Sequence, residues 1–295
     1  MRRVLVTGGS GQLGSELKRF AWPTAWELVS PDIAELDMRD VDAIAALVAS
    51  RDWAAVINAG AYTAVDKAES DIVNAWTVNA LAPAAFASAC ASRNIPIIHV
   101  STDYVFDGAC DGAREPIDPT GPVSVYGASK LGGELAVRTS APRHVIVRTT
   151  WVVSAHGANF VKTMLKLATD RDSLPVVDDQ QGAPTSATDL AAAIATIVMR
   201  LVDDADAPVG TYHFSNAGHV TWAGFAREIF AQSSARGGPS AHVIGIPTAG
   251  YPTRAKRPAN SLLSHSSIRR DYGIVPRPWE VALGDILDEL IGVSK

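Results

Sequence analysis

Short apolar runs alternate with amphipathic segments along the first half of the chain. Val4–Val6 is an apolar run, and beyond a glycine-rich turn Leu13, Leu17 and Phe20 recur at helical spacing. Apolar runs of this kind are typical of strands that are buried on both faces of a parallel sheet. Strands alternating with helices predict an α/β fold, a doubly wound parallel sheet of the Rossmann type. We expect further strands at 27–30, 55–61, 97–100 and 145–148, and helices at 41–50, 63–93 and 125–138.

The texture of the sequence changes after residue 150. Shorter elements are predicted there, with helices at 159–168, 190–201, 222–232 and 279–291 and strands at 176–177 and 211–214. We therefore expect a second, smaller α/β lobe for the substrate. The dinucleotide-binding domain is expected to comprise residues 1–150 and about 184–208, and the substrate lobe about 151–183 and 209–295.

Residues 251–261 form a cationic segment held by prolines, unlike the rest of the chain. A rigid loop that carries arginine and lysine suits a phosphate group on a substrate. A solvated basic loop explains the same pattern equally well.

Composition narrows the class of protein rather than its chemistry. The chain has 295 residues, 47% hydrophobic and 19% charged, which fits a globular protein with a sizeable core. The net charge of −5, without a basic stripe, argues against a nucleic-acid partner. No apolar stretch approaches the roughly 18 residues of a membrane-spanning helix, and Cys90 and Cys110 lack metal-ligand spacing. We expect a cytoplasmic protein with two free thiols and no membrane contact.

The glycine-rich turn after the first strand carries the cofactor signal. Gly8, Gly11 and Gly14 have G-x-x-G-x-x-G spacing between a predicted strand and a predicted helix. Glycines permit a tight turn and close backbone approach, and the N–H groups at the start of a helix bind a pyrophosphate. A purely structural turn would use the same residues. The position between strand and helix favours a dinucleotide site.

Two acidic residues bear on the choice of cofactor. Asp32 lies about 20 positions beyond the glycine turn, where a carboxylate can bind the ribose 2′-hydroxyl. Asp32 also follows Pro31, so a simple turn role is as good an interpretation, and the same alternative holds for Asp37. Because a carboxylate repels a 2′-phosphate, the sequence leaves NADPH and NADH both open.

A second group of residues carries the candidate chemistry. Thr102 and Asp103 follow a predicted strand, and Tyr126 and Lys130 lie at i and i+4 on a predicted helix. A tyrosine has a pKa of about 10, and a lysine one turn away favours the phenolate and lowers that pKa. A hydroxyl at the strand end is suited to hold a carbonyl and stabilise the alkoxide that forms as hydride arrives. The set predicts a carbonyl reductase in which Asp103 orients a sugar hydroxyl or caps the turn.

The order of these motifs resembles the extended short-chain dehydrogenases/reductases and, within them, the dTDP-4-dehydrorhamnose reductase family. The matching runs are Gly8-x-x-Gly11-x-x-Gly14, Asn58-Ala59-Gly60-Ala61, residues 101–106 and Tyr126-x-x-x-Lys130. Narrower matches lie at 63–69, 148–152, 159–160, 179–185 and 257–261. The resemblance covers nearly the whole chain. It implies hydride transfer from NADPH or NADH to the C4 carbonyl of dTDP-4-dehydro-L-rhamnose, which gives dTDP-L-rhamnose.

The resemblance also implies roles for individual residues. Thr102, Tyr126 and Lys130 form the catalytic set, with Tyr126 as proton donor. The implied cofactor contacts are Gly8, Gly11, Gln12, Leu13, Asp32, Asp37, Met38, Ala59, Ala61, Tyr62, Thr63, Tyr126 and Lys130. The implied contacts of the dTDP-linked deoxysugar are Thr102, Asp103, Trp151, Thr63, Val65 and Arg257. Trp151 is expected to face the sugar ring, unless its indole belongs to the core.

Two positions depart from the family pattern. Tyr62 stands where the family has a histidine. Some members are magnesium-linked dimers with acidic residues on the helix after Pro184-Thr185, where this chain has Thr188 and Ala192, although Glu16 and Asp189 remain. The sequence therefore leaves open a need for Mg²⁺ and the choice between monomer and homodimer.

Two other functions remain compatible with the sequence. A nucleotide-sugar epimerase or dehydratase of the same superfamily shares the Thr, Tyr and Lys set, but a dehydratase shows an Asp-Glu pair where this chain has Asp103-Tyr104. A non-catalytic NADP-binding regulatory subunit would not need the intact pair of Tyr126 and Lys130.

Overall fold

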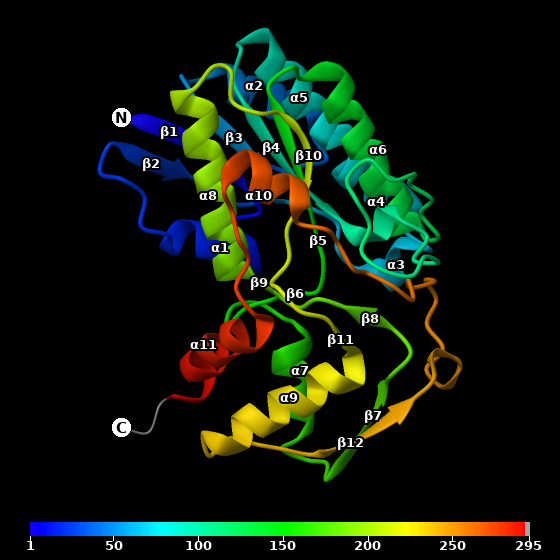
Figure 1. Ribbon diagram of the computed structural model, residues 1–295. Helices are drawn as coiled ribbons and strands as arrows, with labels where there is room; N and C mark the ends of the chain where they lie inside the picture. Colours follow the sequence, from blue (N-terminus) through cyan, green and yellow to red (C-terminus); the bar gives the residue numbers. More distant parts are fainter. Residues whose placement is uncertain (293–295) are drawn as a thin grey trace.

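A six-stranded parallel sheet forms the larger part of the protein. The computed structural model describes residues 1–292. The strand order is β10-β5-β4-β3-β1-β2, and every neighbouring pair is parallel (Figure 1). The predicted doubly wound α/β fold is confirmed. The strands are β1 (Arg2–Thr7), β2 (Trp26–Val29), β3 (Ala55–Asn58), β4 (Ile97–Thr102), β5 (His144–Thr149) and β10 (Gly210–His213).

Helices cover both faces of this sheet because successive side chains of a strand point to opposite sides. Val4 and Val6 pack into the core on one face, and Leu5 packs into the core on the other. The first face carries α1 (Gln12–Arg19), α8 (Ala187–Asp203) and α10 (Ser266–Tyr272). The second carries α2 (Val41–Ala49), α5 (Ala82–Ser92) and α6 (Val125–Ser140), as Figure 1 shows.

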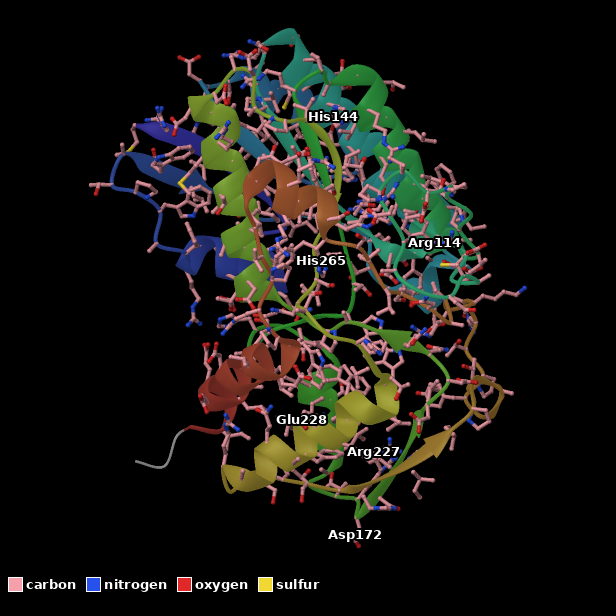
Figure 2. All side chains as sticks on the ribbon, viewed as in Figure 1. Arg114, His144, Asp172, Arg227, Glu228 and His265 are labelled. Atoms are coloured by element: carbon pink, nitrogen blue, oxygen red, sulfur yellow. The ribbon has the colours of Figure 1, made fainter. Side chains whose placement is uncertain are left out.

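A smaller α/β lobe lies beyond the carboxyl ends of the strands. Its parallel pair, β7 (Ser173–Val177) and β12 (His242–Ile246), packs with three helices around a core of its own. The helices are α7 (Phe160–Leu167), α9 (Trp222–Ala235) and α11 (Trp279–Ile291). Asp172, Arg227 and Glu228 lie on this lobe, away from the large sheet (Figure 2). Two-residue strands complete the junction: β6 (Val152–Val153), β8 (Gln181–Gly182), β9 (Thr185–Ser186) and β11 (Val220–Thr221).

Two segments from the range expected for the smaller lobe lie on the large sheet instead. Strand β10 pairs with β5, and Ile268 of α10 is buried in the core on the α8 face. His265, at the start of α10, accordingly lies beside the larger domain in Figure 2. The chain returns to the sheet twice after leaving it. Where the chain returns depends on which parts of the sheet are left uncovered by other elements. Local periodicity cannot predict this.

The single helix predicted for residues 63–93 is wrong, because the structure breaks it. The segment forms α3 (Val65–Ala68), α4 (Ile72–Trp76), a π-helical turn (Thr77–Leu81) and α5. Pro83 stands in the first turn of α5 and has no N–H for a regular helical bond, so the wider turn comes directly before it. Across residues 1–292, none of the helices is both long enough and apolar enough to span a membrane.

Candidate active site

The glycine turn brings the start of α1 against the ends of β1 and β3. Gly8 has φ +70°, and a Cβ on it would lie 2.8 Å from the backbone of Gly60. A Cβ on Gly14 would lie 2.2 Å from the carbonyl oxygen of Gly8. Only glycine fits these positions, because the opposing atoms are backbone that cannot move aside. The turn is therefore a cradle in which a ligand can approach the main chain.

The N-terminus of α1 fits a pyrophosphate. Within the described residues, no side chain caps the helix at Gly11, so its first N–H groups stay available for an anion. The side chain of Gln12 is engaged elsewhere: Nε2 donates to Val152 O at 3.3 Å, and Oε1 accepts from Asn159 Nδ2 at 2.9 Å. The Leu13 side chain is buried in the core. Both residues thus offer their backbone rather than their side chains to a cofactor.

A cavity of about 300 Å³ continues from the glycine turn along the ends of β1, β2 and β3. The glycine turn lies at one end of this cavity. The structure brings six predicted cofactor residues into its wall: Gly8, Asp32, Asp37, Met38, Ala61 and Tyr62. Ala59 lies beside it against the core, and Thr63 is exposed on the chain that follows.

The two acidic residues in this wall are already engaged. Asp32 Oδ1 accepts from the backbone N–H of Ala34 at 2.8 Å, which is the turn role foreseen as the alternative. Asp37 accepts from the Arg39 guanidinium at 2.6 Å, and this contact lowers the pKa of the Asp37 carboxyl. Arg39 also lines the cavity. Sequence reasoning missed this cation, although it stands only two residues beyond Asp37.

The predicted catalytic residues converge at the carboxyl end of β4. Thr102 is the last residue of the strand and Asp103 begins a short 3-10 turn, while Tyr126 and Lys130 lie in the first turns of α6. The Thr102 hydroxyl donates to Asp103 Oδ1 at 3.2 Å, and it lies near enough to the Tyr126 phenol to oppose the rise in that phenol's pKa. Residues 24 positions apart in sequence thus present their hydroxyls to one point, as the arrangement of a carbonyl-binding site requires.

Tyr126 differs from expectation in its acidity. Burial raises the pKa of its phenol above the usual range, the Thr102 hydroxyl opposes this, and the Asp103 carboxylate adds to it. The expected lowering of this pKa by Lys130 is wrong for this structure. Lys130 Nζ instead donates to the Val100 carbonyl at 2.6 Å. Tyr126 therefore holds its proton at neutral pH.

Asp103 is a buried carboxylate with one free oxygen. Burial raises its pKa to about 6, although the nearby hydroxyls of Ser261, Thr102 and Thr150 oppose this rise. Oδ2 has no hydrogen-bond partner among residues 1–292. A buried acceptor without a donor is costly, so this oxygen fits a hydroxyl that arrives with a ligand.

Of the residues implied for the sugar, Trp151 lies at the entrance to the smaller lobe. Its φ is +47°, a strained conformation for a tryptophan, and its ring stacks on Trp222 with a centroid distance of 3.5 Å and an interplanar angle of 12°. The Gly182 backbone abuts the indole, because a Cβ there would lie 2.5 Å from it. Trp151 is thus fixed by packing while it stays only partly buried.

Arg257 ties the cationic segment to the larger domain. Its guanidinium donates to Asp66 Oδ2 at 2.7 Å and to the Tyr104 hydroxyl at 3.4 Å. The Tyr104 ring in turn meets Tyr126 edge-on, with centroids 5.5 Å apart. Val65, the other implied contact on this side, begins α3 next to Asp66 and is partly buried. Arg257 therefore reaches the vicinity of Tyr126.

A largely apolar cavity of about 370 Å³ opens beside Arg257 in the smaller lobe. Trp222 lines this cavity and stacks on Trp151, so the same aromatic pair borders the cavity and the expected sugar site. Sequence reasoning missed this cavity, because its wall combines segments from 160 to 257. The residues that line it include Phe160, Met164, Arg171, Val176, Gln180, Trp222, Tyr251 and Arg257.

One family covers almost the whole chain, since residues 1–291 match the RmlD substrate binding domain. The chain belongs to this family. A relative from Sinorhizobium fredii, named dTDP-4-dehydrorhamnose reductase, is 43% identical over 279 residues, which is 94% of each chain. The RmlD family assignment confirms the resemblance seen in the sequence.

Solved structures of two proteins named dTDP-4-dehydrorhamnose reductase have the same fold as this RmlD family chain. The protein from Clostridium acetobutylicum superposes with a TM-score of 0.91 at 36% identity, over 98% of this chain and 99% of that one. The protein from Bacillus anthracis, solved in complex with NADP, gives 0.90 at 33% identity, over 98% of this chain and 100% of that one.

The two departures from the family pattern have local explanations. Tyr62 donates its hydroxyl to Asp71 Oδ2 at 3.0 Å, and its backbone is held by Asn79, so the chain at the cavity wall is fixed without a histidine. Asn79 also donates to Ser129 on α6. Tyr62 is thus linked through Asn79 to α6, the helix that carries Tyr126 and Lys130.

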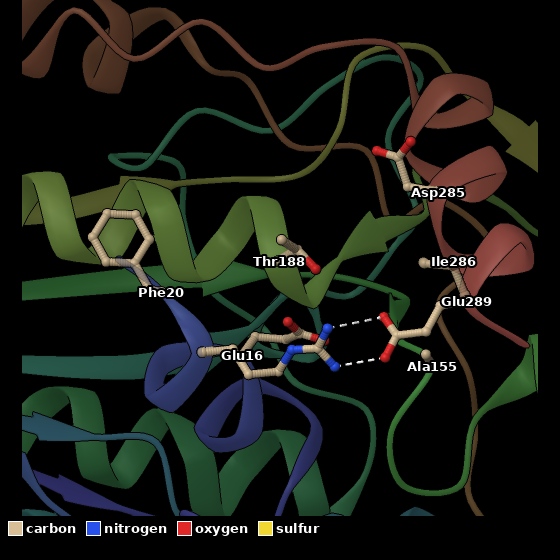
Figure 3. Close-up of a pocket in the computed structure, with 8 residues that line it drawn as sticks. Glu16, Phe20, Ala155, Thr188, Asp285, Ile286 and Glu289 are labelled. Carbon is tan, nitrogen blue, oxygen red and sulfur yellow. Dashed lines mark hydrogen bonds and ion pairs between the residues drawn. The ribbon is translucent and has the colours of Figure 1, made fainter. Parts of the chain in front are cut away.

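Glu16 and Thr188, which were named for the magnesium expectation, line a pocket of about 290 Å³ between α1, α8 and α11 (Figure 3). Glu289 accepts from both terminal nitrogens of Arg19, at 2.5 and 3.3 Å, and Glu16 accepts from Ser154 Oγ at 3.0 Å. Thr188 faces the same pocket. These residues do not fit a divalent cation, because the carboxylates already have donors. In the described part of the chain, no three His, Cys, Asp or Glu side chains form a metal-binding group.

Proposed function

We propose that this chain is a dTDP-4-dehydrorhamnose reductase, which reduces the C4 carbonyl of dTDP-4-dehydro-L-rhamnose to give dTDP-L-rhamnose. The observation that carries the proposal is the convergence of the Thr102 hydroxyl and the Tyr126 phenol at the carboxyl end of β4, beside Asp103 Oδ2, which has no hydrogen-bond partner among residues 1–292. Membership of the RmlD family and the names of full-length relatives support the choice of substrate.

The cofactor site is proposed to take NADPH or NADH. The backbone around Gly8, Gly11, Gln12 and Leu13 holds the pyrophosphate at the start of α1. NADPH or NADH bound there supplies the hydride. The NADP complex of the Bacillus anthracis protein supports this assignment, and Arg39 offers a charge for a 2′-phosphate. The nucleoside end is held by Asp32, Asp37, Met38, Ala59, Ala61, Tyr62 and Thr63.

The proton chemistry belongs to the chain's own residues. Thr102 donates its hydroxyl to the substrate carbonyl and stabilises the charge that develops on that oxygen. Tyr126, whose raised pKa keeps its proton in place, passes the proton to the same oxygen. Lys130 is proposed to hold the nicotinamide ribose. Asp103 orients a sugar hydroxyl through Oδ2.

The remaining substrate contacts are proposed on both sides of the opening. Trp151 presents its indole to the sugar ring, and Arg257 offers its guanidinium to the diphosphate. Thr63 and Val65 lie at the nucleotide end.

Tyr126→Phe tests the mechanism. We expect kcat with dTDP-4-dehydro-L-rhamnose to fall at least about 100-fold, because the proton donor is lost, while the dissociation constant for NADPH stays unchanged. NADPH oxidation at 340 nm, with and without the sugar, measures the first quantity, and fluorescence titration measures the second.

The matched control is Tyr272→Phe, which removes a phenol that donates to Pro208 O on the far side of the sheet. It should retain full activity. Full activity in Tyr126→Phe would refute the proton donor, and a wild-type protein that oxidises no NADPH with this sugar would refute the function.

A further inference from the structure

Glu134 is a fully buried carboxylate that the proposed mechanism does not use. Its side chain is 0% exposed, and four donors saturate it. Arg148 donates through Nε to Oε1 at 2.8 Å and through Nη2 to Oε2 at 2.7 Å, and Ser101 Oγ donates to Oε1 at 2.6 Å. Arg138 adds a bond to Oε2 at 2.7 Å. A buried charge is tolerated only with such complete pairing.

The donors come from two strands that meet at the active site. Ser101 on β4 stands opposite Arg148 on β5 and directly precedes Thr102. Glu134 lies on α6, eight residues beyond Tyr126 and four beyond Lys130, on the same side of the helix. One carboxylate therefore joins the helix of the proton donor to the strand of the carbonyl-binding hydroxyl.

Arg148 is itself buried and contacted on several sides. It is 1% exposed, and Nη1 donates to Pro116 O at 3.2 Å. Its guanidinium carbon lies 4.9 Å from the centre of the Phe106 ring, and its Nη1 lies 3.4 Å from His213 Nε2 on β10. Glu134 thus docks onto a fixed partner, and the geometry of α6 depends on that partner.

Glu134 also acts on the charge of Lys130. Burial lowers the pKa of Lys130 to about 8, and the Glu134 carboxylate opposes this. Lys130 in turn adds to the burial that lowers the pKa of His99 on β4. The titratable and charged groups around Glu134 and Lys130 are Tyr126 and Arg138 on α6, His99 on β4 and Arg148 on β5.

We propose that Glu134 is a positioning residue of the reductase site, because its carboxylate fixes α6, with Tyr126 and Lys130, against Ser101 and Arg148 beside Thr102. A second effect follows from the same contact, since the negative charge helps Lys130 to keep its proton. The inference rests on the proposed function of Thr102, Tyr126 and Lys130.

Glu134→Gln tests this role, because glutamine keeps the shape of the side chain and removes its charge. We expect kcat/KM at neutral pH to fall about 10- to 100-fold through displacement of the reacting groups. Loss of the carboxylate lowers the pKa of Lys130 further, so the alkaline limb of the pH profile should move to lower pH. The pH above which NADPH affinity falls, titrated without sugar, should move in the same direction.

Asp189→Asn is the matched control, since Asp189 on α8 likewise accepts two bonds from an arginine, Arg277. It should lower the melting temperature without moving either pH profile. Ser101→Ala removes one donor and keeps the Glu134 charge, so it decides the positioning role if Glu134→Gln does not fold. We expect it to lower kcat several-fold with an unmoved pH profile.

Two results overturn the proposal: pH profiles of Glu134→Gln that coincide with those of the wild type, or a Ser101→Ala protein with full kcat. A wild-type protein without reductase activity overturns the proposed function instead. The sugar-free NADPH titrations distinguish the two failures, because they need no turnover.

Discussion

Asp103 is a residue whose proposed role in binding conflicts with the stability of the fold. Its carboxylate is 3% exposed, and its pKa of about 6 shows that the fold disfavours the charged form. An acid whose pKa is higher in the folded than in the unfolded state loses stability as pH rises. Here that loss accumulates between about pH 4 and pH 6 and is complete above it. The proposed site therefore keeps an acceptor for the sugar at the expense of stability at neutral pH.

Asp103→Asn should reverse this balance. The amide removes the buried charge, so we expect the free energy of unfolding at pH 8 to rise by up to about 3 kcal/mol, from a shift of about two pKa units. The gain should shrink at pH 5, where much of the wild-type carboxyl is protonated. Urea unfolding at the two pH values measures it, with Asp288→Asn on the surface of α11 as control. A variant less stable than the wild type at pH 8 would contradict the pKa.

The turn from β1 into α1 works as an element rather than through any one side chain. Gly8 supplies a positive φ, and Gly14 allows the helix to lie against the carbonyl of Gly8. The uncapped start of α1 then faces the cavity that ends at Asp37 and Arg39. Close packing of backbone on backbone creates the proposed anion site, and any Cβ at Gly8 or Gly14 must push the turn and the helix apart.

Gly14→Ala should push α1 away from the glycine turn. The new methyl group would meet Gly8 O at 2.2 Å, so we expect a loss of about 1–3 kcal/mol in stability and at least a tenfold weaker affinity for NADPH. Gly121→Ala is the control, because a Cβ there meets only Asp107 Cβ, at 3.8 Å. Thermal unfolding and NADPH fluorescence report the two effects. Normal NADPH affinity in Gly14→Ala would show that the turn is not the binding cradle.

At the scale of the whole molecule, a few polar contacts join the two lobes around the site. Gln12 on α1 bonds to Val152 and Asn159, and Arg257 reaches across to Asp66 on α3. The Arg257–Asp66 pair is partly exposed, with 30% and 42% of the side chains accessible, so its own contribution to stability is small. Its importance lies in holding a cation at the edge of the proposed substrate site.

Arg257→Ala should therefore act on substrate binding. We expect KM for the nucleotide sugar to rise about tenfold or more, as for the loss of a charged hydrogen bond, while NADPH affinity and melting temperature change little. Arg254→Ala, an exposed cation in the same segment, is the control. Steady-state kinetics with varied sugar separates the two variants. An equal effect of both substitutions would show that residues 251–261 are only a solvated basic loop.

The local pattern of the chain determined the fold class and the candidates for chemistry. Continuous apolar runs, helical spacing after the glycines, and Tyr126 four residues before Lys130 are visible in neighbouring residues, so the strands of the large sheet and the position of α6 were predictable. The roles of the individual site residues remain predictions. Where the segments 209–213 and 266–272 pack was not predictable, because that depends on which part of the sheet is left uncovered.

Only the tertiary structure decided the partners of the charged groups. Glu134 meets Ser101 from 33 residues away, and Arg257 meets Asp66 from 191 residues away. The pKa of Tyr126 followed burial and not the nearby lysine, since Lys130 turns to the Val100 carbonyl. Spacing along a helix fixes which residues share a side. The desolvation of a side chain and its charged partners depend on which segments pack against that side of the helix. The local sequence does not contain this information.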